Sequence, residues 1–353
     1  MGATPRGDSF FGEAGAFDPM MGQLEVIEPG ITMYHSFANV AFAYGGGEML
    51  AADTSPAQMG ALALKAIREV TSEPFAFLIY THGHFDHAFG TEAFITDNLS
   101  RGYPRWKIWA HEDVAARFER YRLTRGWQSH INRLQFGVRI PPDAMFAGNS
   151  FTHPDLTYRD MQLLELEREP VELRHAMGET DDATWVWMPR RRLAMVGDLI
   201  VSSLRNTGNP NKVQRYTLEW AGAPEQIDAR KPRIVLAGHS PAYRGEDICH
   251  ELLTGTAPRY VSFMRRWWRA SIADSDLSTS SRPTLNFPMT SRRSRFCARS
   301  ADACRSWCAT SSAATRDGGR DSRRRCSRRS AAMSRRKSSG CAAAINFSRV
   351  LAQ

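Results

Sequence analysis

The chain has 353 residues, of which 42% are hydrophobic, so it can form one large domain or two ordinary ones with a sizeable core. No stretch of about 18 apolar residues occurs, so we expect no membrane span. The first residues lack a basic segment followed by an apolar run, so we expect no secretory signal and a cytoplasmic protein.

Charge is unevenly distributed along the chain. The net charge is +9, but residues 291–353 hold 16 Lys and Arg against 3 Asp and Glu, a net charge of +13. Residues 1–290 therefore carry −4, and a mildly acidic body argues against nucleic acid as the partner. This body has one cysteine, Cys249, and therefore no internal disulfide, which fits a reducing compartment.

The first half of the body alternates β-rich segments with helical ones. Residues 1–22 are rich in glycine and predict an irregular arm. Ser55 and Pro56 predict the N-cap and first residue of a helix that ends near Val70, and a polar helix is expected up to about Arg125. Short β-rich runs predict strands at 24–28, 31–37, 39–44, 48–54, 75–80 and 107–111. The run at 75–80 is apolar throughout, as expected for a strand covered on both faces.

The second half repeats this alternation after residues 126–160, which give no clear pattern. Its helices are expected at about 218–229 and 244–270. Its strands are expected at 161–167, 171–176, 183–188, 192–198 and 233–239. This order suits two packed sheets with helices outside them, an α+β fold in which residues 23–270 form one domain.

Four potential metal ligands follow the apolar strand at 75–80, in the pattern His82-x-His84-x-Asp86-His87. Alternate residues of an extended chain point the same way, so His82 and His84 can bind one ion. The chain must then turn, and Asp86 and His87 can face a second ion. Imidazoles and carboxylates suit Zn²⁺ or a similar divalent cation. A site for a single metal ion is the alternative.

This pattern resembles the signature of the metallo-β-lactamase superfamily, and the resemblance extends over about residues 23–245. The run EMLAADTS (48–55) is similar to the strand that ends in an Asp-Thr pair in that family. The runs GETDDATWVWMP (178–189) and RRRLAMVGD (190–198) are similar to its third motif and its metal-bridging residue. The resemblance implies a four-layer αββα sandwich with two divalent ions, zinc being favoured. It places Asp198 as the bridging ligand and His239 as the last histidine ligand.

One departure from the family pattern concerns the third motif, in which a histidine usually stands between Gly and Thr. This chain has Glu179 there, and the alkyl sulfatase branch of the superfamily also has Glu, with a similar spacing to the bridging carboxylate. We therefore favour Glu179 as a ligand and keep His175 as the alternative. Asp181 and Asp182 could orient a histidine ligand through its distal N–H or could simply be turn residues. The sulfatase branch bridges its metals with Glu, whereas this chain has Asp198.

Two ions that share a carboxylate can hold a water molecule and lower its pKa from about 15.7 toward about 7, which supplies hydroxide at neutral pH. We therefore predict a hydrolase with Asp86 and Asp198 at its catalytic centre. The segment after Asp198 is rich in donors that could bind an anionic small-molecule substrate such as a sulfate ester, or it could be a solvated loop. These donors are Arg205, Asn206, Asn209, Lys212, Arg215 and Tyr216.

Three functions remain open at this point. The first is hydrolysis of small-molecule esters such as alkyl sulfates. The second is hydrolysis of a thioester, lactone or β-lactam by another branch of the superfamily. The third is a nucleic-acid-binding protein or nuclease that uses the basic tail, against which the acidic body argues.

Residues 271–353 have a different composition, dominated by Ser, Arg and Ala without a hydrophobic period. Such a segment cannot bury a core, so we predict a disordered tail. Arg, Ser, Ala, Gly and Cys are what GC-rich codons yield in the wrong reading frame, and we hypothesise a frameshift near residues 275–295. The alternatives are a basic tail that binds anionic partners and a cysteine metal module. The tail cysteines are Cys297, Cys304, Cys308, Cys326 and Cys341.

Overall fold

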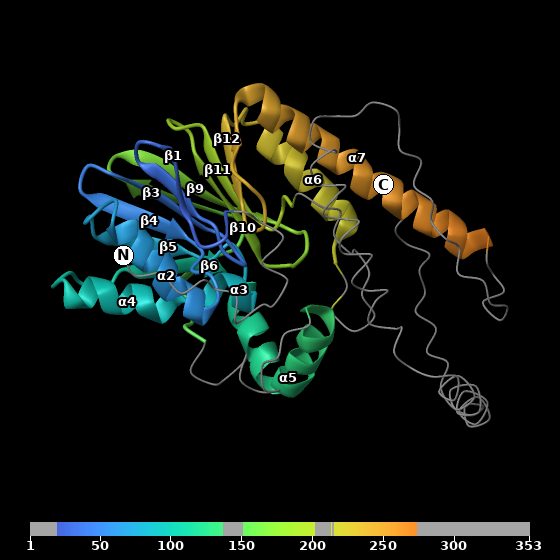
Figure 1. The fold of residues 1–353 in the computed structure, drawn as a ribbon. Helices are drawn as coiled ribbons and strands as arrows, with labels where there is room; N and C mark the ends of the chain where they lie inside the picture. The colour runs from blue at the N-terminus through green and yellow to red at the C-terminus, as the bar shows by residue number, and fades with distance from the viewer. Residues whose placement is uncertain (1–19, 137–150, 202–212, 214, 274–353) are drawn as a thin grey trace. The chain divides into compact units, whose positions relative to one another are not determined.

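The computed structural model describes residues 20–136, 151–201, 213 and 215–273. These residues form two mixed β-sheets with helices against them, which confirms the predicted four-layer sandwich (Figure 1). The predicted N-terminal arm, except for its last residues, and the predicted disordered tail, except for residues 271–273, which end a helix, lie outside the described residues. Among the helices that the structure describes, none has the length and apolar character needed to cross a bilayer.

The first sheet has seven strands in the order β1-β2-β3-β4-β5-β6-β7. Strands β1 to β4 pair antiparallel, and β4 to β7 pair parallel. Parallel pairing brings the carboxyl ends of β4 and β5 to the same edge of the sheet. The strands are β1 (Leu24–Glu28), β2 (Ile31–Tyr34), β3 (Val40–Gly45), β4 (Glu48–Ala52), β5 (Phe75–Ile79), β6 (Lys107–His111) and β7 (Leu156–Tyr158).

The second sheet has six strands in the order β13-β12-β11-β10-β9-β8. Strands β11 and β12 pair parallel, so their carboxyl ends lie at one edge, where the antiparallel β10 begins. The strands are β8 (Met161–Leu166), β9 (Glu169–Ala176), β10 (Ala183–Met188), β11 (Leu193–Gly197), β12 (Ile234–Ala237) and β13 (Tyr243–Arg244).

Helices lie on the outer side of each sheet (Figure 1). Helices α2 and α4 pack against the first sheet, and α6 and α7 lie beside the second. The helices are α2 (Ala57–Arg68), α3 (Phe85–Ala88), α4 (Thr91–Ser100), α5 (Asp113–Phe136), α6 (Thr217–Asp228) and α7 (Glu246–Ala273).

Strand β5 shows how the core is built in two layers. Its residues Leu78 and the following Tyr80 pack toward the helices with the aromatic and aliphatic side chains of α2 and α4. Phe77 and Ile79 point the other way, into the layer between the sheets. Because successive side chains of a strand alternate between its faces, a strand buried on both sides must be apolar throughout. The expectation for residues 75–80 is confirmed.

The helix boundaries differ from the expectations in three places. Ser55 is not a helix cap: Pro56 holds that position, and Ser55 has a left-handed φ of 64° with its hydroxyl bonded to the Ser36 hydroxyl at 2.6 Å. Helix α5 continues to Phe136, with non-helical dihedral angles at Thr124, where its end was expected. Helix α4 was not predicted, because its residues carry little hydrophobic periodicity.

Candidate metal centre

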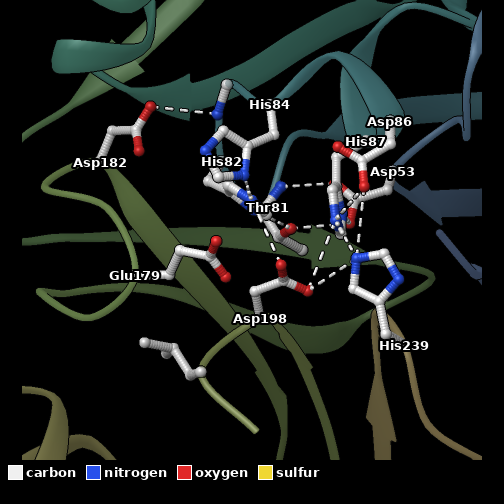
Figure 2. Close-up of polar contacts among 12 residues, drawn as sticks. Asp53, Thr81, His82, His84, Asp86, His87, Glu179, Asp182, Asp198 and His239 are labelled. Carbon is white, nitrogen blue, oxygen red and sulfur yellow. Dashed lines mark hydrogen bonds and ion pairs between the residues drawn. The ribbon is translucent and has the colours of Figure 1, made fainter. Parts of the chain in front are cut away.

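The candidate ligands lie at one edge of the two sheets, just beyond the ends of parallel strands (Figure 2). His82 follows β5, Asp198 follows β11, and His239 follows β12. Glu179 comes in the turn before β10, which runs antiparallel to β11 and so begins at the same edge. The strand order therefore brings four separate parts of the sequence together.

Three of these residues form a set that we call the first ligand group: His82, His84 and Glu179. The Nε2 atom of His82 is 2.9 Å from Nδ1 of His84. One ligand atom each of His84, Glu179 and Asp198 lie within 4.8 Å of one another. His82 is buried, the Glu179 side chain is 6% exposed and His84 is partly buried, so the nitrogen and oxygen atoms of the group are largely shielded from bulk water.

A second ligand group consists of Asp86, His87 and His239, whose ligand atoms also lie within 4.8 Å of one another. The Nε2 atoms of His87 and His239 face each other at 3.3 Å, and His239 Nε2 is 3.3 Å from a carboxylate oxygen of Asp86. Helix α3 carries both Asp86 and His87, and the His87 ring also lies beside that of His82, with ring centroids 4.1 Å apart. Two imidazoles and a carboxylate are thus arranged around a common point.

Asp198 lies between the two groups (Figure 2). Its Oδ1 atom is 3.4 Å from Nε2 of His239 and 3.5 Å from Nε2 of His87. Its Oδ2 atom is 3.8 Å from Nε2 of His82, in the first group. One carboxylate oxygen therefore faces each group, which is the arrangement that a bridging ligand requires.

Asp53 determines which nitrogen of His87 carries the proton. Its carboxylate accepts hydrogen bonds of 2.7 Å from the backbone N–H and the hydroxyl of Thr81, and it lies 2.7 Å from Nδ1 of His87. An ionised carboxylate can only accept, so Nδ1 of His87 is the donor, and Nε2 is the nitrogen that faces the second group. Asp53 has a left-handed φ of 64°, a conformation that Asp tolerates better than most residues.

The charges around the second group favour a cation. Burial lowers the pKa of His87, but the nearby Asp198, Asp53 and Asp86 outweigh it and raise that pKa to about 10. Burial raises the pKa of Asp86, but His87 and His239 outweigh it and lower that pKa to about 2. Three carboxylates around one buried imidazole give this place a negative environment, which suits a divalent cation.

The first group favours neutral imidazoles. Burial and the neighbouring His87 lower the pKa of His82, while burial, His82 and Arg117 lower the pKa of His84 well below its usual value. Neutral imidazole is the form that binds a metal ion. The donor set of both groups, which mixes imidazole nitrogens with carboxylate oxygens, therefore fits divalent ions such as Zn²⁺.

Glycines allow the strands to approach closely at this edge. A Cβ atom on Gly238 would lie 2.6 Å from Oδ1 of Asp198 and 2.6 Å from Cε1 of His87. Gly197 has a φ of 49°, and a Cβ atom there would lie 2.4 Å from the Thr81 hydroxyl. A side chain at either position would push the ligands apart, so the sequence leaves these two positions without one.

The superfamily profile described as "Metallo-beta-lactamase superfamily" matches residues 45–239. The chain belongs to this superfamily. The match covers more than half of the sequence and contains every candidate ligand from His82 to His239. The clusters of His, Asp and Glu described above are the candidate metal ligands of this member of the metallo-beta-lactamase superfamily.

Solved structures with this fold include a stereoselective inverting sec-alkylsulfatase, Pisa1, from Pseudomonas sp., with 16% identity and a TM-score of 0.60 over 73% of this chain and 46% of that chain. A double mutant of Pisa1 gives 17% identity and a TM-score of 0.61 over 71% and 43%. The chain thus spans less than half the length of these structures. A metallo-beta-lactamase family protein from Thermus thermophilus has 17% identity and a TM-score of 0.51 over 71% and 84%. Comparison with curated proteins gave no match.

The two alternatives for the third-motif ligand lie in different surroundings. Glu179 points toward Asp198 and the histidines (Figure 2), and one of its oxygens accepts a hydrogen bond from Arg215. His175 instead stacks on His111, with ring centroids 3.9 Å apart, and its Nε2 atom donates to the backbone carbonyl of Asp181 at 2.8 Å. His175 is therefore placed to support the turn that carries Glu179.

The predicted substrate segment is only partly described. Arg205, Asn206, Asn209 and Lys212 lie outside the described residues. Arg215 is paired with Glu179, and the backbone N–H of Tyr216 donates to Gly178 at 3.0 Å. The end of this segment therefore contacts the third motif. The role of these six residues in substrate binding stays a prediction.

Sequence reasoning missed three residues that support the ligands. Asp53 lies in the run that resembles an Asp-Thr strand end, so that resemblance was the signal for it. Asn39 donates to the backbone carbonyls of Ala237 and Ser240, on either side of His239, at 3.0 and 2.8 Å. Neither Asn39 nor Arg117, a buried arginine of α5, stands in a recognisable motif, so no signal in the sequence pointed to them.

Proposed function

We propose that the chain is a dinuclear hydrolase that cleaves small-molecule esters, with alkyl sulfates as the favoured class, and that its hydrolase domain spans residues 23–270. The observation that carries the proposal is the position of Asp198, which presents one oxygen to each ligand group. His82, His84 and Glu179 would hold one ion, and Asp86, His87 and His239 the other. Asp198 would be shared between them.

Bound divalent ions, with zinc favoured, supply a water of lowered pKa and polarise the bond that is attacked. The protein's own residues set the conditions for this. Asp53 keeps the proton of His87 on Nδ1, and the negative charges of Asp86 and Asp198 draw cations to the centre. We assign Asp86 and Asp198 as catalytic residues because both would be ligands of the ions that hold the reacting water.

The preference for sulfate esters rests on two features. Glu179 stands where the superfamily usually has histidine, as in the alkyl sulfatase branch that the sequence resembles, and the Pisa1 structures share the fold. The segment from Arg205 to Tyr216 begins seven residues after the proposed bridging residue and is rich in donors that suit an anionic head group. An anionic small molecule is therefore the proposed partner of this segment.

One observation favours a second candidate, a thioester, lactone or β-lactam hydrolase of the same superfamily. The bridging position holds Asp198, whereas the alkyl sulfatase branch has Glu there. Asp is one methylene shorter than Glu, so the same strand end would hold its carboxylate at a different depth. A substrate panel therefore has to decide between alkyl sulfates and the substrates of the second candidate.

The panel uses the zinc-loaded full chain with secondary alkyl sulfates, acyl thioesters, lactones and β-lactams as substrates. We expect the highest kcat/KM for an alkyl sulfate and no turnover of that substrate by the Asp198→Ala variant. The Asp228→Ala variant is the matched control, because Asp228 pairs with the exposed His250. Higher kcat/KM for a thioester, lactone or β-lactam would move the assignment to the second candidate, and no turnover of any substrate would refute both.

A further inference from the structure

Arg117 is buried beside the candidate metal centre, although it belongs to neither ligand group. Its side chain is 5% exposed and comes from the first turns of α5. A guanidinium is unfavourable away from water unless carboxylates and hydrogen-bond acceptors surround it. Arg117 meets this requirement through the turn that precedes β10: its Nε donates to Oδ2 of Asp182 at 2.7 Å, and a second nitrogen pairs with Asp181.

The same oxygen of Asp182 reaches the metal-binding loop. Oδ2 of Asp182 accepts a hydrogen bond of 3.0 Å from the backbone N–H of Gly83, the residue between His82 and His84 in the sequence. Asp182 is fully buried. One carboxylate oxygen thus joins α5, through Arg117, to the peptide that separates two candidate ligands.

This contact is close-packed. A Cβ atom on Gly83 would lie 3.0 Å from both Cδ of Arg117 and Oδ2 of Asp182. The turn that Arg117 holds through Asp181 and Asp182 also carries Glu179. The loop that carries His82 and His84 and the turn that carries Glu179 therefore both pack against the Arg117 side chain. The second group is held differently: His87 is bonded to Asp53, across the site.

We propose that Arg117 is a positioning residue for the first ligand group. It fixes the spacing between the loop that presents His82 and His84 and the turn that presents Glu179, and it acts through Asp182. The hydrogen bonds of Arg117 go to the carboxylates of that turn rather than to a proposed ligand. Loss of its guanidinium should therefore weaken the binding of one metal ion and leave the binding of the other unchanged. This inference rests on the proposed dinuclear site.

The test is a zinc titration of the metal-stripped full chain by calorimetry, with a competing chelator to resolve two affinities. Arg117→Lys keeps the charge but cannot donate in two fixed directions as a guanidinium does. We expect this variant to bind one ion as tightly as the wild type and the other about 10- to 100-fold more weakly, the usual effect of losing an outer partner of a metal ligand. The ion that weakens should be the one that Glu179→Gln also weakens.

The matched control is Arg68→Lys. Arg68 is also buried, at 8% exposure of its side chain, and also donates two side-chain hydrogen bonds to carboxylate, both to Asp97, but it lies on α2. Arg68→Lys should leave both zinc affinities unchanged even where it lowers the melting temperature. If Arg117→Lys and Arg68→Lys each lowered the affinity for both ions to the same extent, Arg117 would be a general stabilising residue and the inference would be overturned.

A second variant covers the case in which Arg117→Lys folds poorly. Asp182→Asn removes the charge that links Arg117 to Gly83 and should weaken the same ion. The double variant Arg117→Lys, Asp182→Asn should bind that ion no more weakly than the more severe single variant, because both changes break the same connection. Additive losses, or unchanged affinities, would overturn the inference alone. A wild-type chain that binds no zinc would overturn the proposed function and the inference together.

Discussion

The two ligand groups are supported by different kinds of contact. The first group depends on guanidinium–carboxylate pairs, with Arg215 on Glu179 and Arg117 on Asp182. The second group depends on hydrogen bonds at the strand ends, where Asp53 holds His87 and Asn39 holds the backbone on both sides of His239. Substitutions of these two arginines should therefore disturb the first group, and substitutions of Asp53 or Asn39 the second.

The largest effect should come from the residue that the two groups share. Asp198→Ala removes the carboxylate that faces both, so we expect activity to fall by on the order of 10³-fold or more, the scale for loss of a principal electrostatic group. Bound zinc, measured by atomic emission, should fall at both sites. Retention of full activity and two bound ions by Asp198→Ala would refute the shared role of this residue.

The next effect separates Glu179 from His175. Glu179→Gln removes a negative charge from the first group and should reduce affinity for one ion by about 100-fold or more, above the effect of losing an outer partner. His175→Ala removes a hydrogen bond to the carbonyl of Asp181 and should be milder. Zinc affinities of the two variants decide the point: the reverse ranking would transfer the ligand role to His175.

A smaller change addresses the second group. Asn, like Asp, tolerates the left-handed φ at residue 53, so Asp53→Asn should keep the backbone. Its amide can present a donor to Nδ1 of His87 and so move the ring proton to Nε2, where it opposes metal binding. We expect one ion to weaken about 10- to 100-fold. The prediction fails when this variant weakens the same ion as Glu179→Gln.

The smallest effect should come from a change outside both groups. Removal of residues 274–353 should leave zinc stoichiometry and kcat/KM unchanged, because every proposed ligand precedes this segment. Sequencing of the gene across residues 275–295 tests the proposed frameshift separately. Loss of zinc from the shortened chain, or an intact reading frame through that region, would contradict the account of the tail.

Most of the fold could be predicted because its signals are local. The apolar run at 75–80 is followed within seven residues by His82, His84, Asp86 and His87. A strand that ends in metal ligands can therefore be predicted from residue order alone. The two-sheet order followed from alternating β-rich and helical runs. The short strand β13 and the helix α4 were missed, since two residues and a weakly periodic segment carry no such signal.

The contacts that arrange the ligands could not be predicted in the same way. Arg117 and Asp182 are 65 residues apart, and Asn39 is about 200 residues from the carbonyls that it holds. Pairing over such separations depends on the packing of sheets and helices, which a single sequence does not specify. Ser55 shows the opposite error: its local pattern predicted a helix cap, but its hydroxyl bonds to Ser36, 19 residues away.

Anomalous scattering at the zinc edge from crystals of the zinc-loaded full chain tests the dinuclear site most directly. We expect two peaks, one bounded by His82, His84 and Glu179 and the other by Asp86, His87 and His239, with Asp198 between them. A single peak, or a first peak bounded by His175 in place of Glu179, would contradict the proposed arrangement of the two groups.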